Sequence, residues 1–135
     1  MKLPPITLDV MRHSYELLAA CPPFADWNLP PSSEVQFART RKATVRGRYD
    51  SWCDKGHTKN PDKIKRCRIS VNPRHIDDFD ELLQVMAHEM IHVHEHRAGM
   101  RTQADHSEAF LLIARDVCKR YGWRADTFVF GDMPR

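Results

Sequence analysis

Five consecutive residues, His88-Glu89-Met90-Ile91-His92, combine side chains that could hold a metal ion and activate water on it. On an α-helix, positions four apart share one face, so His88 and His92 can present two imidazoles to a single ion. Glu89 lies about 100° further around the helix and can reach a water on that ion. This is the pattern of zinc hydrolases, in which the metal lowers the pKa of the water and the carboxylate accepts its proton. The alternative is a histidine-rich, solvated helix that carries the pattern by chance.

Two further histidines on the same predicted helix are excluded as the third ligand that a catalytic zinc site requires. His96 lies two turns from His88, about 12 Å at 1.5 Å per residue, which is too far for a shared ion. His94 points to a different face of the helix.

The next predicted element offers two other candidates for the third ligand. His106 lies at the start of this element, and Glu108 follows two residues later. Glu108 can instead form a helix-capping box with Asp105, three positions before it. His106 is therefore the predicted third ligand, and Glu108 remains the alternative.

These residues resemble the SprT-like family of zinc metallopeptidases, which includes the Spartan proteases. The resemblance rests on the run 88–92, on His106 with Phe110 four residues later, and on two upstream segments, 41–49 and 67–71. It covers most of the chain from about residue 35 to residue 121.

The resemblance implies a role for each matching residue. His88, His92 and His106 correspond to the zinc ligands, and Glu89 corresponds to the general base of peptide-bond hydrolysis. Family members process proteins crosslinked to DNA, so protein substrates, bound or crosslinked to DNA, are expected. Two features depart from the family: Ser107 replaces the glycine that often follows the third histidine, and no cysteine-rich zinc ribbon follows the protease core.

The hydrophobic pattern predicts an α+β fold. Three- and four-residue spacings predict a helix over 7–20, and a proline-rich connection follows it to residue 34. Alternation with a period of two then predicts three short strands, which together form a small, mostly antiparallel sheet over 35–37, 45–49 and 67–71. Helical spacing returns over 79–93 and 107–121, where the zinc helix and a ligand-bearing helix are expected. With the resemblance, this order predicts a zincin-like domain.

The length of 135 residues predicts a single domain. Its core is expected over about 35–121, after an N-terminal helix and connection over 1–34 and before a C-terminal tail over 122–135. No apolar run is long enough to span a membrane, and the N-terminus has no signal-peptide core, so no membrane contact is expected. We therefore expect a cytoplasmic protein, or a nucleoid or nuclear one if it associates with DNA. The four cysteines are widely spaced and suggest neither a zinc ribbon nor disulfides.

Positive charge is concentrated in residues 39–68. This segment holds eleven Lys and Arg residues against three Asp residues, a net charge of +8, whereas the whole chain carries +3. Such a segment can attract a polyanion such as DNA. Arg46, Arg48, Lys63 and Lys65 are the predicted phosphate contacts, and a merely solvated surface is the alternative.

Two other functions fit parts of the same pattern. The chain could be a catalytically silent DNA-binding adaptor with a structural zinc, although Glu89 argues against this because a structural site needs no base. It could also be a zinc hydrolase of a non-peptide bond. For stabilisation of the oxyanion, Arg97, Tyr49 and His57 are candidates.

Overall fold

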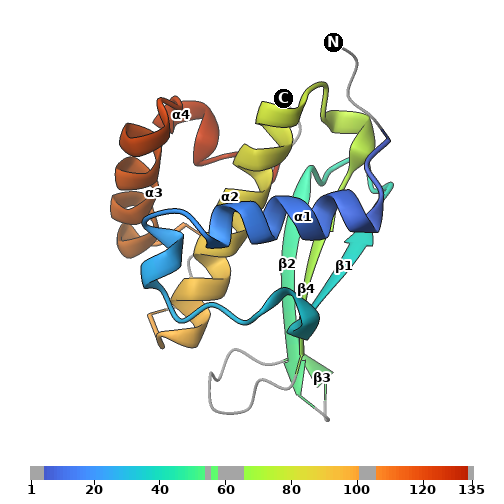
Figure 1. Cartoon of the computed structure of the whole chain (residues 1–135). Helices are drawn as coiled ribbons and strands as arrows, with labels where there is room; N and C mark the ends of the chain where they lie inside the picture. The colour runs from blue at the N-terminus through green and yellow to red at the C-terminus, as the bar shows by residue number, and fades with distance from the viewer. Residues whose placement is uncertain (1–4, 54–55, 58–65, 101–105, 134–135) are drawn as a thin grey trace.

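The computed structural model describes residues 5–53, 56–57, 66–100 and 106–133 (Figure 1). In these ranges the chain forms helices α1 (Leu8–Ala19), α2 (Phe79–Arg97), α3 (Glu108–Tyr121) and α4 (Ala125–Phe128), and strands β1 (Val35–Arg39), β2 (Gly47–Cys53), β3 (Gly56–His57) and β4 (Arg66–Val71). The predicted α+β class is confirmed. None of the described helices is long and apolar enough to cross a bilayer.

The sheet has the strand order β1-β4-β2-β3 and is mixed. β2 and β4 are antiparallel, as predicted, with Gly47 opposite Val71. β1 and β4, however, are parallel, with Val35 opposite Cys67, and within the described ranges the short strand β3 pairs with the end of β2. The predicted, mostly antiparallel character of the sheet is confirmed, because two of its three strand pairs are antiparallel. The prediction of three strands omitted the two-residue strand β3. A period of two identifies the buried face of a strand but says nothing about the direction of its neighbour.

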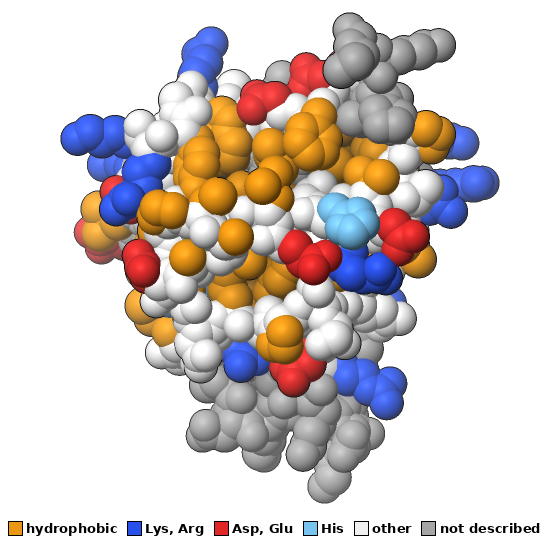
Figure 2. All heavy atoms as spheres, viewed as in Figure 1, with side chains coloured by type: hydrophobic (Ala, Val, Ile, Leu, Met, Phe, Trp, Pro, Cys, Tyr) orange, Lys and Arg blue, Asp and Glu red, His pale blue; other side chains and the backbone are white. Residues whose placement is uncertain are grey.

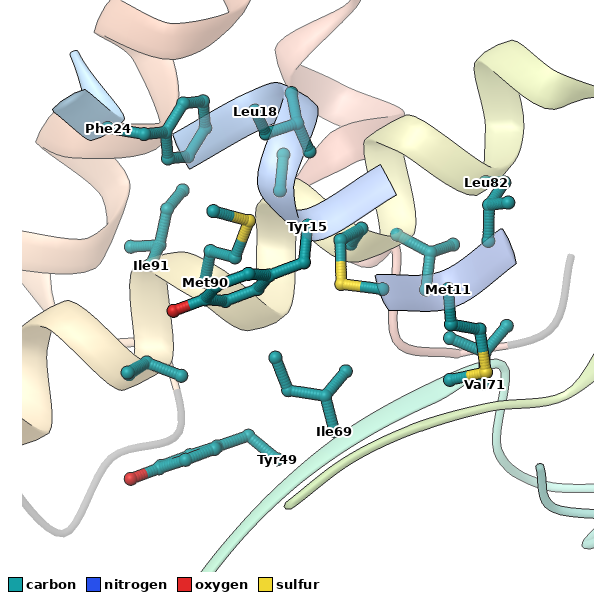
Figure 3. Packing of buried hydrophobic residues seen from close by; sticks show 14 of the residues in the cluster. Met11, Tyr15, Leu18, Phe24, Tyr49, Ile69, Val71, Leu82, Met90 and Ile91 are labelled. Carbon is teal, nitrogen blue, oxygen red and sulfur yellow. The ribbon is translucent and has the colours of Figure 1, made fainter. Parts of the chain in front are cut away.

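The core lies where α1 and α2 pack together over the sheet (Figure 1). In this core, Tyr15 of α1 lies beside Met90 of α2 and above Ile69 of β4, and Met11 of α1 lies beside Val71 of β4 (Figure 3). Each of these side chains is at most 1% exposed. Removing one such apolar side chain from water contributes about 1.5–3 kcal/mol. This packing fixes α2, the helix that carries the candidate ligands, against the sheet.

Side chains cap the N-termini of α1, α2 and α3. Thr7 and Asp78 accept hydrogen bonds from backbone N–H groups at the starts of α1 and α2. Ser107 caps α3 by accepting from the backbone N–H of Phe110 at 3.1 Å. The predicted capping box of Asp105 with Glu108 is wrong, because the cap is Ser107; Asp105 itself lies outside the described residues.

The predicted C-terminal tail, residues 122–135, contains a short helix that packs on the fold. It starts at Gly122, whose positive φ of 71° ends α3 as predicted. It then forms α4, whose Phe128 is 1% exposed. The chain after α4 returns to α2, where it meets the candidate ligands.

Candidate metal centre

Three of the predicted site residues come together with one that was not predicted. His88 and His92 of α2, His106 just before α3, and Asp132 after α4 each offer a ligand atom, and these atoms all lie within 4.8 Å of one another. We call these four residues the ligand cluster. His88 and His92 are buried, and the other two are half-buried. The cluster could hold one metal ion.

The spacing inside the cluster suits a small tetrahedral ion. The Nε2 atoms of His88 and His106 are 3.3 Å apart. Around tetrahedral zinc with bonds of 2.0–2.1 Å to nitrogen, neighbouring ligand atoms are about 3.3–3.4 Å apart. These two imidazoles are therefore already placed as zinc ligands would be.

A backbone carbonyl fixes the tautomer of His88. Its Nδ1 lies 2.9 Å from the carbonyl oxygen of Phe128, and a carbonyl can only accept, so Nδ1 carries the proton. The Nε2 atom then presents its lone pair to the cluster. A hydrogen bond of this kind from the second ring nitrogen is typical of metal-binding histidines, because it orients the ring and raises its basicity.

Glu95 orients a second ligand and joins two helices. Its Oε1 lies 3.5 Å from Nδ1 of His92, and its Oε2 accepts a hydrogen bond of 2.9 Å from Ser107 Oγ. Ser107 caps α3 and directly follows His106, so Glu95 helps to position both His92 and His106. Glu95 is 2% exposed and was not predicted. The signal available in the sequence was a carboxylate three residues after a histidine on one helix.

Glu89 borders a cavity beside the cluster. This cavity, of about 430 Å³, is lined by Glu89, His92 and Asp132 on one side and by residues of β2 on the other. Gly47 of β2 approaches α2 closely: a Cβ at this position would lie 2.5 Å from Val85 Cγ1 and 3.1 Å from Glu89 Oε1. The absence of a side chain at Gly47 thus allows β2 and the predicted base to border one cavity.

Asp132 adds a negative charge to the three imidazoles. Its two carboxylate oxygens lie 3.7 Å from Nε2 of His88 and of His106, respectively. Burial raises the pKa of Asp132, but the two imidazoles lower it further, so the net pKa lies well below its usual range. No spacing in the sequence relates residue 132 to the other ligands, so only the tertiary structure reveals it.

His94 and His96, which helix geometry excluded as zinc ligands, do lie outside the ligand cluster. The ring of His94 stacks on Trp27 with centroids 4.2 Å apart, and burial lowers its pKa. Nδ1 of His96 lies 3.1 Å from Tyr49 Oη and 3.0 Å from Ser51 Oγ. Glu108, the alternative third ligand, is exposed on α3 and is not part of the cluster.

Of the two oxyanion candidates whose side chains the structure describes, only Tyr49 is placed at the cavity. It lines the cavity together with Glu89 and His92. Arg97 instead donates a hydrogen bond from Nε to the backbone oxygen of Asn28, at 3.1 Å. The side chain of His57 lies outside the described part of the chain.

The predicted phosphate contacts are placed differently from one another. Arg46 is 2% exposed, and its guanidinium lies 3.2 Å from Glu81 Oε2, so its burial argues against a phosphate contact. Arg48 is exposed and donates from Nε to Asp50 at 3.0 Å. Lys63 and Lys65 lie outside the described residues.

Comparison with known proteins places the chain in a family. No curated protein and no solved structure matches it. The model of the SprT-like family matches residues 16–128, which run from α1 through α4 and include His88, His92 and His106. Since this match covers most of the 135 residues, the chain belongs to the SprT-like family.

Proposed function

We propose that this protein is a zinc metallopeptidase with a zincin-like fold. The observation that carries the proposal is the convergence of three imidazoles from α2 and the turn before α3, with Glu89 bordering the adjacent cavity. A zinc ion held by His88, His92 and His106 would polarise the scissile carbonyl and lower the pKa of the attacking water. Glu89 accepts the proton of that water and then delivers it to the leaving amine.

An open strand edge offers a place for the peptide. In the described residues, β2 from Gly47 to Ser51 has β4 on one side and no strand on the other. Backbone groups on such an edge can pair with an extended chain. A peptide along β2 would run past the cavity bordered by Glu89 and His92, so its scissile bond would reach the predicted base and ligands.

Removal and return of zinc tests the peptidase function. We expect the zinc-loaded protein to cut an unfolded protein such as reduced casein, and we expect chelation to abolish cutting, because the attacking water is activated by the metal. Adding about one equivalent of zinc should restore it. Mass spectrometry of the fragments would identify the cleaved bonds. A protein that holds its zinc but cuts no unfolded substrate would contradict the peptidase proposal and favour a non-peptide hydrolase or an adaptor.

We also propose that the substrates are proteins bound or crosslinked to DNA. The surface available for phosphate contact includes Arg48, but three other exposed arginines form a better-defined feature. Arg39, Arg41 and Arg74 line a depression of about 400 Å³ at the end of β1. On the face that carries α1, hydrophobic side chains occupy the centre and Lys and Arg side chains lie mainly at the margins (Figure 2). The arginine-lined depression is the favoured contact surface, because it brings three exposed guanidinium groups together.

Charge reversal at Arg39, Arg41 and Arg74 tests this surface. DNA binding should be independent of sequence, with a dissociation constant of about 10⁻⁴–10⁻⁶ M at physiological salt, and should weaken as salt rises, because phosphate contacts release counterions. Replacing all three arginines by Glu should weaken binding and reduce the slope of its salt dependence. Fluorescence anisotropy of a labelled duplex and a labelled single strand, across a salt series, measures both.

A triple variant with the same change in charge provides the control. Arg115 and Arg120 are exposed on α3 and Arg12 of α1 is partly exposed, all three outside the lining of the depression, so their replacement by Glu should affect DNA binding less. Equal losses of DNA affinity in the two triple variants would show that binding depends on net charge and not on the depression. Absence of salt-dependent binding at low ionic strength would contradict the role of DNA.

A further inference from the structure

The chain after α4 encloses the ligand cluster. We call residues 128–133 the closing segment. The carbonyl oxygen of Phe128 accepts the hydrogen bond from His88, and the ring of Phe130 lies against that of His106 with centroids 6.1 Å apart. The closing segment therefore contacts two of the three predicted ligands before it reaches Asp132.

Close packing brings Asp132 to the cluster. A Cβ added at Gly131 would lie 2.9 Å from the carbonyl oxygen of Phe128 and 3.5 Å from Nδ1 of His88, so glycine lets the backbone pass close to this hydrogen bond. The backbone oxygen of Asp132 then accepts hydrogen bonds from the N–H groups of Arg46, at 2.8 Å, and Gly47, at 3.2 Å. The closing segment is thus fixed at both of its ends, and its one carboxylate faces the imidazoles.

The carboxylate of Asp132 has the environment of a metal ligand. A buried carboxylate oxygen is costly without a partner, and Oδ1 of Asp132 is buried without a hydrogen-bond partner among the described residues. At 3.7 Å, its distance to Nε2 of His88 exceeds that of a hydrogen bond. A cation between these atoms would satisfy both of them.

We propose that Asp132 is a fourth protein ligand of the metal ion and that it closes the site until it is displaced. This inference rests on the proposed zinc site. Catalytic zinc usually has three protein ligands and keeps a fourth position for water. With Asp132 bound, that position is filled. Asp132 lies beyond residue 128, where the family match ends, so the match does not supply this ligand.

The same residue also occupies part of the proposed peptide-binding edge. Its carbonyl oxygen accepts hydrogen bonds from the N–H groups of Arg46 and Gly47 at the start of β2, where an extended substrate would pair. Substrate and Asp132 therefore compete for the backbone of β2 and for access to the ion. Release of the closing segment frees the backbone of β2 and the fourth position on the ion together. Until that release, the protein does not hydrolyse other proteins unselectively.

Replacement of Asp132 by Asn or Ala tests the inference with two binding measurements. Loss of the charged ligand should weaken zinc binding by about tenfold or more, since even partners that only hydrogen-bond to ligands contribute 10–100-fold. Competition with a fluorescent chelator measures this. In the cobalt(II)-loaded protein, the same variants should bind acetohydroxamate about tenfold more tightly, because its oxygens no longer compete with a carboxylate. Titration followed by the visible absorption of cobalt measures this second effect.

Asp126 provides the matched control. It lies on α4, is exposed and pairs with Arg124, so Asp126→Asn should change neither affinity. Unchanged zinc and hydroxamate affinities in both Asp132 variants would overturn the inference. So would weaker zinc binding without tighter hydroxamate binding, because Asp132 would then only support the fold. A wild-type protein that binds no zinc would instead contradict the proposed function itself.

Discussion

Replacing Glu89 by Gln is expected to lower the rate of peptide cleavage by about 10²–10⁴-fold, the usual contribution of a general base. The amide has nearly the same volume as the carboxylate but cannot accept the proton of the attacking water. Because Glu89 is 1% exposed and close to Gly47, a substitution that preserves its volume should leave the packing intact. The variant should therefore keep its zinc and unfold near the wild-type temperature. Cleavage of a quenched fluorescent peptide, elemental analysis and thermal unfolding measure the three quantities.

Glu108→Gln is the matched control for this experiment. Glu108 is an exposed glutamate at the start of α3, outside the ligand cluster, so its replacement should preserve both zinc and activity. If Glu89→Gln keeps its activity within a few-fold of wild type, Glu89 is not the base, and the proposed mechanism is wrong.

Single replacements of His88, His92 and His106 by Ala should each remove most of the zinc, from about one ion per chain to nearly none after gel filtration. Each substitution removes one imidazole from a site whose ligand atoms lie within 4.8 Å of one another. The loss should be greatest for His88, whose Nε2 is oriented by the carbonyl of Phe128. Elemental analysis of the purified variants provides the measurement.

His94→Ala is the control, because His94 belongs to the same helix but stacks on Trp27 away from the cluster. It should retain the full zinc content. Full retention by His106→Ala would contradict its assignment and leave His88, His92 and Asp132 as the protein ligands.

The sequence was most informative where helical geometry alone relates the residues. His88, Glu89 and His92 lie within five positions of one helix, so their relative placement does not depend on the rest of the fold. His106 was predicted partly through the family resemblance, and its position in the structure depends on Ser107 and its hydrogen bond to Glu95. No local pattern could identify such a contact between two helices.

The features that the sequence did not reveal depend on tertiary contacts. The alternating pattern of β1 and β4 located both strands but contained no information on their parallel pairing. Arg46 was counted as surface charge, yet it is buried beside Glu81, because charge in a sequence does not reveal which ions are paired inside the fold. Asp132 was assigned to a tail for the same reason: its contacts are with residues far away in the chain.

The four members of the ligand cluster come from three separate parts of the chain: α2, the turn before α3, and the closing segment. An ion bound to all of them acts as a cross-link that exists only in the folded state. Binding energy and folding energy are then thermodynamically linked, and an ion at 1,000 times its dissociation constant would stabilise the fold by about 4.1 kcal/mol. Zinc supply would thus set how much of this protein remains folded, in addition to how fast it works.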